Sequence, residues 1–138
     1  MKIVLDTNVL IAAFIAHGSC SELLEHCAVR HVIVLSQAIL NELQDVLVRK
    51  FDFTHTEARL AGRLLKSRGQ LVKPSPLPEP VCRDPDDDMI LATAITGGCL
   101  AIITGDKDLT DLTEYKGVRI LMPSEFWQFE NEIVEQDL

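Results

Sequence analysis

Short apolar runs alternate along the chain with longer stretches of helical periodicity. Four runs rich in β-branched residues have the length of buried strands, at 2–5, 31–35, 100–104 and 117–122. Helical patterns occupy the intervals and the chain end, at 9–16, 21–28, 37–51, 56–66 and from 123 onwards. Strands that alternate with helices favour a parallel sheet covered on both faces. We therefore predict a three-layer α/β/α fold with a central, mostly parallel sheet of four to five strands.

Several helix ends carry the residues that stabilise them. Ser36 stands directly before one helical pattern and Thr54 two positions before the next, and both are good N-caps. Asp84 precedes Pro85, a residue favoured at the first helical position, so Asp84 is expected to cap the next helix. Gly98 marks the end of that helix. These signals favour a helix that begins at Pro85, within the aspartate-rich stretch, and ends near Gly98.

One segment, PSPLPEP at 74–80, holds four prolines in seven positions and predicts a stiff, extended connector. Neither side of it has enough strands for a sheet of its own. We therefore expect one domain over 1–138, with 74–80 as a loop and 123–138 as a C-terminal helix and tail. A length of 138 residues suits one domain with a sizeable core.

Composition places the chain among globular proteins. Apolar residues make up 47% of it, yet no apolar run reaches the ~18 residues of a membrane span. The N-terminus also lacks the cleavage site of a signal peptide. We expect a cytoplasmic protein with no membrane partner and with reduced cysteines. A zinc site could be assembled from His17, Cys20, His26 and Cys27, but their spacing matches no structural zinc pattern.

The charge is unevenly distributed. The net charge of −8 alone would argue against a nucleic-acid partner. Residues 49–73, however, contain seven bases and two acids, a local charge of +5 that leaves −13 for the remainder. Arg59, Arg63 and Lys66 recur at i, i+4 and i+7, on one helix face. This stripe is either a surface that follows phosphates or an ordinary solvated helix face.

Carboxylates follow the predicted strands at the edge where ligands bind. Asp6 comes directly after the first strand, and Asp106 follows the third strand by one glycine. In an open parallel sheet the carboxyl ends of the strands form the ligand site. Turn chemistry alone could also account for Asp6, and for Asp106 with Asp108. Both strand ends nevertheless predict acids at one edge.

Two helices add further acids. The stretch CRDPDDDMILATAI has four aspartates in five positions. Capping and the helix dipole explain Asp84, Asp86 and in part Asp87, which stands at the capping-box position. Helical spacing puts Asp88 on an apolar face, so we expect it to point inward. Glu42 is flanked on its helix face by apolar residues, or else lies at the border of the wet face.

So many carboxylates at one edge require compensation. Two carboxylates ~4 Å apart repel by roughly 4 kcal/mol at an effective dielectric of 20. The group must therefore take up protons, spread apart or bind cations. Oxygen ligands without histidine or thiolate favour magnesium or manganese.

At this point the chain resembles PIN-domain ribonucleases. The resemblance is carried by IVLDTNVL, LSQAILNEL, DPDDDMILATAI and IITGDKDL, in this order along nearly the whole chain. The nearest branch is similar to the VapC-type toxins of bacterial and archaeal toxin–antitoxin pairs. The resemblance implies an endoribonuclease that uses one or two Mg²⁺ or Mn²⁺ ions. It also implies an RNA substrate, an antitoxin partner and a homodimer or higher homo-oligomer.

The resemblance also assigns roles to residues. It makes four acids catalytic metal ligands, namely Asp6, Glu42, Asp88 and Asp106. Asp108 is an additional candidate ligand, and Asp84 or Asp87 replaces Asp88 if the helix is placed differently. Thr7, Asn8 and Thr104 fall where the family has supporting polar groups. Near Arg59, Arg63 and Lys66, the family offers antitoxin docking as an alternative to RNA contact.

Three other interpretations compete with a ribonuclease. A haloacid-dehalogenase-like phosphatase also opens with an aspartate after its first strand, but it requires an acid where this chain has Asn8. A receiver-like signalling module requires a phosphoacceptor aspartate after a middle strand, and HVIVLSQA has none. A PIN fold that only binds RNA or protein stays open, because metal ligands alone do not establish turnover.

Overall fold

A six-stranded sheet forms the centre of the computed structural model, which describes residues 1–136. Its order is β3-β2-β1-β4-β6-β5, and every neighbouring pair is parallel except β5 with β6. The strands are β1 (Lys2–Leu5), β2 (Val32–Leu35), β3 (Gly69–Leu71), β4 (Ala101–Ile103), β5 (Glu114–Tyr115) and β6 (Val118–Leu121). The mostly parallel sheet is confirmed, with six strands where we expected four to five.

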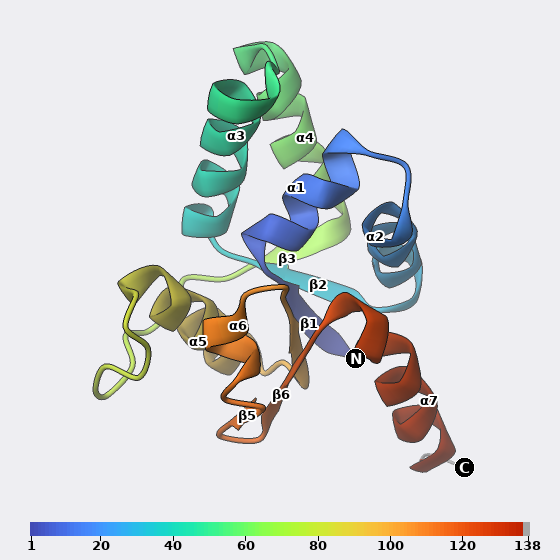
Figure 1. The fold of residues 1–138 in the computed structure, drawn as a ribbon, viewed down its shortest axis with the longest axis vertical. Helices are drawn as coiled ribbons and strands as arrows, with labels where there is room; N and C mark the ends of the chain where they lie inside the picture. Colours follow the sequence, from blue (N-terminus) through green and yellow to red (C-terminus); the bar gives the residue numbers. More distant parts are fainter. Residues whose placement is uncertain (137–138) are drawn as a thin grey trace.

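Helices cover both faces of this sheet. They are α1 (Thr7–Ile15), α2 (Ser19–Arg30), α3 (Gln37–Phe51), α4 (His55–Arg68), α5 (Pro85–Gly97), α6 (Lys107–Thr110) and α7 (Phe126–Gln136), with a 3₁₀ turn η1 (Pro123–Glu125) before α7. Helix α5 packs against β1, β2 and β4, whereas α1 to α4 gather on the other side (Figure 1). The three-layer prediction is therefore confirmed.

The predicted caps lie where the sequence places them. The Ser36 hydroxyl accepts a hydrogen bond from the Ile39 amide at 3.3 Å. Thr54 and Glu57 form a reciprocal capping box with two hydrogen bonds of 3.0 Å. Asp84 caps α5 by accepting the amide of Asp86 at 2.9 Å. These caps satisfy amides that each helix start would otherwise leave unpaired.

The core lies on both sides of β1. Ile3, Val4 and Leu5 have no exposed surface, as expected for a parallel strand covered on two faces. Helix α5 approaches β2 closely because Gly97 faces Val34. A Cβ at Gly97 would lie 2.6 Å from a Val34 methyl carbon, so a larger residue would push the helix outward. This close contact helps to fix the rotation of α5.

Two short strands and one short helix were not predicted. Strand β3 starts at Gly69, where a Cβ would lie 2.7 Å from the carbonyl oxygen of Ile33. Strand β5 is two residues long and pairs with β6 across a turn at Lys116 and Gly117, whose φ values are 47° and 84°. Two positive φ values are typical of a type I′ hairpin turn. These elements, GQL, EY and KDLT, are short and lack the β-branched apolar run by which the four-residue strands β1, β2 and β6 were predicted.

The segment between β3 and α5 contains the proline-rich stretch 74–80 and has no helix or strand. The Ser75 amide donates to the Thr96 hydroxyl at 2.9 Å, which ties this segment to α5. The predicted C-terminal segment is η1 and α7, and its last two positions, 137–138, lie outside the described residues. Across residues 1–136, no single helix is long and apolar enough to cross a membrane. Helices α1 and α2 meet that criterion only as a pair, bent by 109°.

Candidate active site

The strand order changes direction at β1, and acids lie at that point. From β1 the chain continues to β2 and β3 on one side, while β4 and β6 lie on the other. The carboxyl ends of β1 and β4 therefore border the crevice where doubly wound sheets bind ligands. Asp6 follows β1, and its amide donates to the Ile103 carbonyl of β4 at 2.9 Å. The backbone thus fixes Asp6 at the edge of this crevice.

Both carboxylate oxygens of Asp6 are held by neighbours. Oδ1 accepts the Thr7 amide and Oδ2 accepts the Thr104 hydroxyl, each at 2.7 Å. Asp6 is only 7% exposed, and burial raises its pKa, opposed by these two hydrogen bonds and assisted by the charge of Asp106. The predicted supporting residues Thr7 and Thr104 are therefore both in contact with Asp6.

Thr104 connects Asp6 to the acids after β4. Its hydroxyl accepts the Asp106 amide at 2.9 Å while it donates to Asp6. Asp106 in turn caps α6 by accepting the Asp108 amide at 2.9 Å. One hydroxyl and one short helix thereby set the positions of three carboxylates.

Asp87 completes a compact acidic group. Asp87, Asp106 and Asp108 each bring a carboxylate oxygen within 4.8 Å of the other two. Burial and then the negative charge of Asp106 raise the pKa of Asp87 to about 7. The Arg83 guanidinium donates to both oxygens of Asp108, at 2.9 and 3.1 Å, and offsets part of this charge. Arg83 was missed by sequence reasoning, because it lies in an irregular segment 25 residues from its partner.

The prediction that Asp88 points into this site is wrong. Its carboxylate turns to the preceding loop and accepts the amides of Val81 at 3.2 Å and Cys82 at 2.8 Å. Helix α5 starts as predicted, with Asp84 as its cap, but the inward residue of the first turn is Asp87, which is 8% exposed. The contact with Asp106 and Asp108 thus belongs to Asp87, the alternative considered above.

Glu42 and Asn8 lie at the border of the site. The Thr7 hydroxyl donates to Glu42 at 3.4 Å, and the side chain of Glu42 is exposed. Partial desolvation and then the charges of Asp6 and Asp86 raise the pKa of Glu42. Asn8 is exposed and accepts the Gly105 amide at 3.5 Å. Glu42 is thus electrostatically linked to Asp6, but it lies outside the compact group of three aspartates.

The donor chemistry suits a hard divalent cation. Asp6, Asp87, Asp106 and Asp108 offer carboxylate oxygens only, the ligand type that magnesium and manganese prefer. Burial and then neighbouring negative charge raise the pKa of Asp6 and of Asp87, so a bound cation would favour the ionised form of both. The residues present therefore fit a Mg²⁺ or Mn²⁺ site at the edge of the sheet.

The basic stripe lies on another part of the molecule. Arg59, Arg63 and Lys66 are exposed on α4, which lies away from α5 and α6 (Figure 1). Among the described residues, the only side-chain hydrogen bond that these three residues make runs from Arg59 to Thr56, at 3.5 Å. The structure thus leaves these cations available to a partner but does not bring them to the acidic group.

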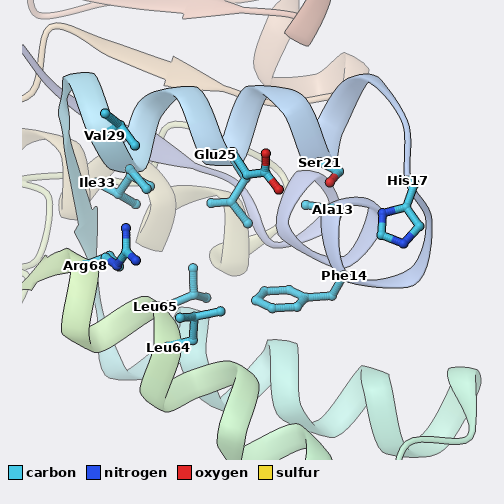
Figure 2. A pocket seen from close by; sticks show the side chains of 12 residues that line it. Ala13, Phe14, His17, Ser21, Glu25, Val29, Ile33, Leu64, Leu65 and Arg68 are labelled. Atoms are coloured by element: carbon cyan, nitrogen blue, oxygen red, sulfur yellow. The ribbon is translucent and has the colours of Figure 1, made fainter.

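A hollow lined mainly by apolar side chains lies between α1, α2 and α4. Its volume is about 600 Å³, and Phe14, Leu64 and Leu65 point into it (Figure 2). Glu25 and Arg68 are the charged residues on its lining. Leu64 is 51% exposed, so part of this apolar surface faces solvent. Such a hollow suits an apolar side chain of a partner better than a charged ligand.

Comparison with known proteins agrees with this geometry. A family model described as a PIN domain matches residues 2–108. The uncharacterized protein MJ1680 of Methanocaldococcus jannaschii is 29% identical over 126 residues, which cover 83% of this chain and 76% of that protein. The crystal structure of VapBC2 from Rickettsia felis bound to a DNA fragment from their promoter contains a chain with a similar fold. The TM-score is 0.62 at 18% identity, and the match covers 87% of this chain and 97% of that one.

Proposed function

Because the chain belongs to the PIN-domain family, we propose that it is a divalent-metal-dependent endoribonuclease. The observation that carries the proposal is the convergence of Asp6, Asp87 and Asp106 at the strand-order switch of the sheet. Family membership and an all-oxygen site both support phosphodiester hydrolysis. They leave a PIN fold that only binds as the alternative to be tested.

We assign the ligands from the contacts of each acid. Asp6, Asp87 and Asp106 would hold one or two Mg²⁺ or Mn²⁺ ions, with Asp108 as a further ligand. When bound, such an ion supplies the charge that lets an anionic phosphodiester approach the acidic edge and activates water for attack. Glu42 would act from the border of the site, and we assign Asp88 to positioning the loop rather than to the metal.

The chain's own residues orient the site. Thr104 donates a hydrogen bond to Oδ2 of Asp6 and so fixes the orientation of this carboxylate. The lone pairs that its two oxygens still offer therefore point in a fixed direction. Arg83 pairs with Asp108 while 87% of its own side chain is exposed, so the guanidinium can also reach a phosphate. Asn8 is exposed beside Gly105 and can contact the substrate backbone. RNA as the substrate is part of the proposal.

The direct test compares Asp106→Asn with Asp111→Asn. Asp111 is an exposed aspartate at the other end of α6, paired with Lys107, and serves as the matched control. Cleavage of a labelled single-stranded RNA is measured in Mn²⁺ and after chelation. We expect Mn²⁺-dependent cleavage by the parent and by Asp111→Asn, and its loss in Asp106→Asn with RNA binding retained. Equal cleavage by Asp106→Asn, or cleavage that persists after chelation, would refute the metal-dependent mechanism.

The apolar hollow supports a second part of the proposal, a protein antitoxin as partner. VapC-type PIN proteins, which this chain resembles, work in pairs, and a partner helix could place an apolar side chain against Phe14 and Leu64. The measurement is co-purification of the chain with a VapB-type antitoxin expressed together with it. Leu64→Asp should abolish it, and Val134→Asp, a substitution at an exposed position of α7, should not. A homodimer or higher homo-oligomer, also proposed, is checked by light scattering of the same samples.

A further inference from the structure

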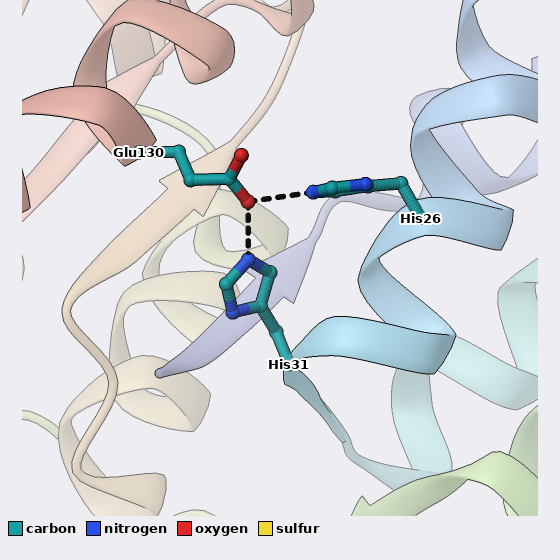
Figure 3. A group of neighbouring side chains, drawn as sticks. All are labelled: His26, His31 and Glu130. Atoms are coloured by element: carbon teal, nitrogen blue, oxygen red, sulfur yellow. Dashed lines mark hydrogen bonds and ion pairs between the residues drawn. The ribbon is translucent and has the colours of Figure 1, made fainter. Parts of the chain in front are cut away.

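A second polar cluster joins α2 to α7 at the amino end of the sheet. The Nε2 atoms of His26 and His31 lie 2.6 and 2.5 Å from the same oxygen of Glu130, Oε2 (Figure 3). Two imidazole nitrogens and one carboxylate oxygen thus meet at one point, all within 4.8 Å of one another. Glu130 is far from both histidines in sequence, 104 positions from His26 and 99 from His31.

The surroundings of this cluster are those of a formed site rather than of a surface ion pair. The exposed fractions of the His31, Glu130 and His26 side chains are 11%, 17% and 28%. Phe126 packs edge-on against both histidine rings, and Trp127 packs against that of His26. An apolar wall on one side strengthens polar interactions within the cluster, and the partly open His26 provides an entry path.

We propose that His26, His31 and Glu130 form a transition-metal site, with Zn²⁺ as the expected ion, that fastens α7 to α2. Two histidines and a glutamate are an established zinc ligand set, which leaves a fourth position for water. Bonds of about 2.0 to 2.2 Å place tetrahedral donors roughly 3.3 Å apart. The present Nε2–Oε2 distances are shorter, so the carboxylate of Glu130 must retreat by less than about 1 Å, which its flexible side chain permits.

The ion would replace the protons that the cluster now shares. In the metal-free protein at least one histidine Nε2 donates to Glu130, and a metal needs the lone pair of that nitrogen. For His31 the remaining proton must then lie on Nδ1. Each Nε2 proton that the ion displaces goes to solvent, so zinc uptake should release protons and weaken as the pH falls.

This site and the acidic edge differ in ligand chemistry. Imidazole suits zinc and its neighbours in the transition series, whereas carboxylates alone suit magnesium and manganese. The His26–His31–Glu130 proposal is independent of the proposed ribonuclease activity. It can therefore be tested in a background of Asp87→Asn with Asp106→Asn, in which the acidic site is disabled.

The experiment titrates the full chain, in both backgrounds, with Zn²⁺ by calorimetry and with Co²⁺ by visible absorption. We expect one Zn²⁺ per chain, the ligand-field bands of four-coordinate cobalt, and a melting temperature that rises with Zn²⁺. His26→Gln is the main variant, because His26 is the most exposed ligand and its loss should spare folding. His55→Gln, at the exposed start of α4, is the matched control.

Removing one ligand should weaken Zn²⁺ binding by more than the roughly 10- to 100-fold that the loss of a supporting group costs. Glu130→Gln preserves the shape of the cluster and should lose zinc as His26→Gln does. Zn²⁺ binding that is unchanged in His26→Gln, or lost only with the acidic site, would overturn the proposal. Absence of any Zn²⁺ effect on the parent would equally overturn it and leave a hydrogen-bonded clamp.

Discussion

The two ends of one sheet hold polar clusters of opposite character. At the carboxyl end, Asp6, Asp87 and Asp106 are all acids, and burial together with like charge raises the pKa of Asp87 to about 7. At the amino end, Glu130 is also partly buried, and burial alone would raise its pKa. Hydrogen bonds from His31 and His26 outweigh burial there and leave the pKa of Glu130 lowered. A four-residue strand, roughly 13 Å long, separates the two environments.

The contrast shows that partners can outweigh burial in setting the pKa of a carboxylate, as at Glu130, or add to it, as at Asp87. Glu130 has two histidine nitrogens on one oxygen, whereas Asp87 has the carboxylate of Asp106 beside it. The carboxylate charge at the amino end is therefore offset by other groups of the chain. At the carboxyl end it is offset only in part, by Arg83. Carboxylates whose charge is not offset take up protons or bind cations. A cation-dependent site needs such a group of acids.

The largest expected effect separates two adjacent aspartates. Asp87→Asn should lower Mn²⁺-dependent cleavage by more than the roughly 10- to 100-fold typical of groups that only support metal ligands. Asp88→Asn, one residue further along α5, should retain both Mn²⁺ binding and cleavage, because its carboxylate contacts the loop amides instead. Rates at saturating RNA and Mn²⁺ calorimetry measure the difference. The opposite ranking would restore Asp88 as the metal ligand.

Asp88 should instead be needed for stability. Asp88→Ala removes the acceptor of the Val81 and Cys82 amides, and an unpaired, partly buried donor costs about 1 to 3 kcal/mol. Loss of the Asp84 cap in Asp84→Ala should cost about 0.5 to 2 kcal/mol. Urea unfolding of the metal-free variants gives both values. If Asp88→Ala is as stable as the parent, the loop contacts contribute nothing.

The pH dependence of stability should differ between the two ends. Asp87 has a folded pKa of about 7 and an ordinary value of 3.8, so the metal-free native state holds a proton that the unfolded chain has lost between these values. Its contribution to stability therefore falls as pH rises through this window. The lowered pKa of Glu130 acts oppositely, because its contribution is lost as pH falls below the ordinary value of 4.5.

Thermal unfolding of metal-free protein between these pH values tests the point. Asp87→Asn should flatten the decline towards neutral pH, and saturating Mg²⁺ should do the same in the parent. Glu130→Gln should leave that decline intact and change only the acid limb. A parent whose stability rises steadily from the acid range to neutrality would contradict the raised pKa of Asp87.

Much of this arrangement could be predicted because it is local. Strand β1 with Asp6, the Ser36 and Thr54 caps and the Asp84 start of α5 all follow from short stretches of sequence. The choice between Asp87 and Asp88 does not. Neighbouring helical residues differ by about 100° in direction, so the inward one depends on the rotation of the helix.

That rotation is set by tertiary packing, including the contact between Gly97 and Val34. Val34 lies on β2, far from the aspartates in sequence. The pairing of Arg83 with Asp108 is equally non-local. The same holds for His26 and Glu130, since no local spacing connects α2 with α7. The zinc set considered from sequence, with His17 and two cysteines, instead grouped residues by proximity in the chain. Local patterns thus locate the elements, while contacts between elements select the side chains of each site.

The smallest expected effect concerns how an acidic protein attracts RNA. The acidic edge needs a cation before it can meet a phosphate, so initial contact should depend on exposed bases elsewhere, and Arg59 and Arg63 on α4 are candidates. Replacing both by Ala should weaken RNA binding and reduce the salt slope by up to roughly 0.7 per lost phosphate contact. Cleavage at saturating RNA should persist, because neither arginine lies in the acidic group. Arg49→Ala, which removes an exposed base already paired with Asp45, is the control. An unchanged slope in the double variant would make α4 a solvated face or a protein-docking surface and leave the metal site unaffected.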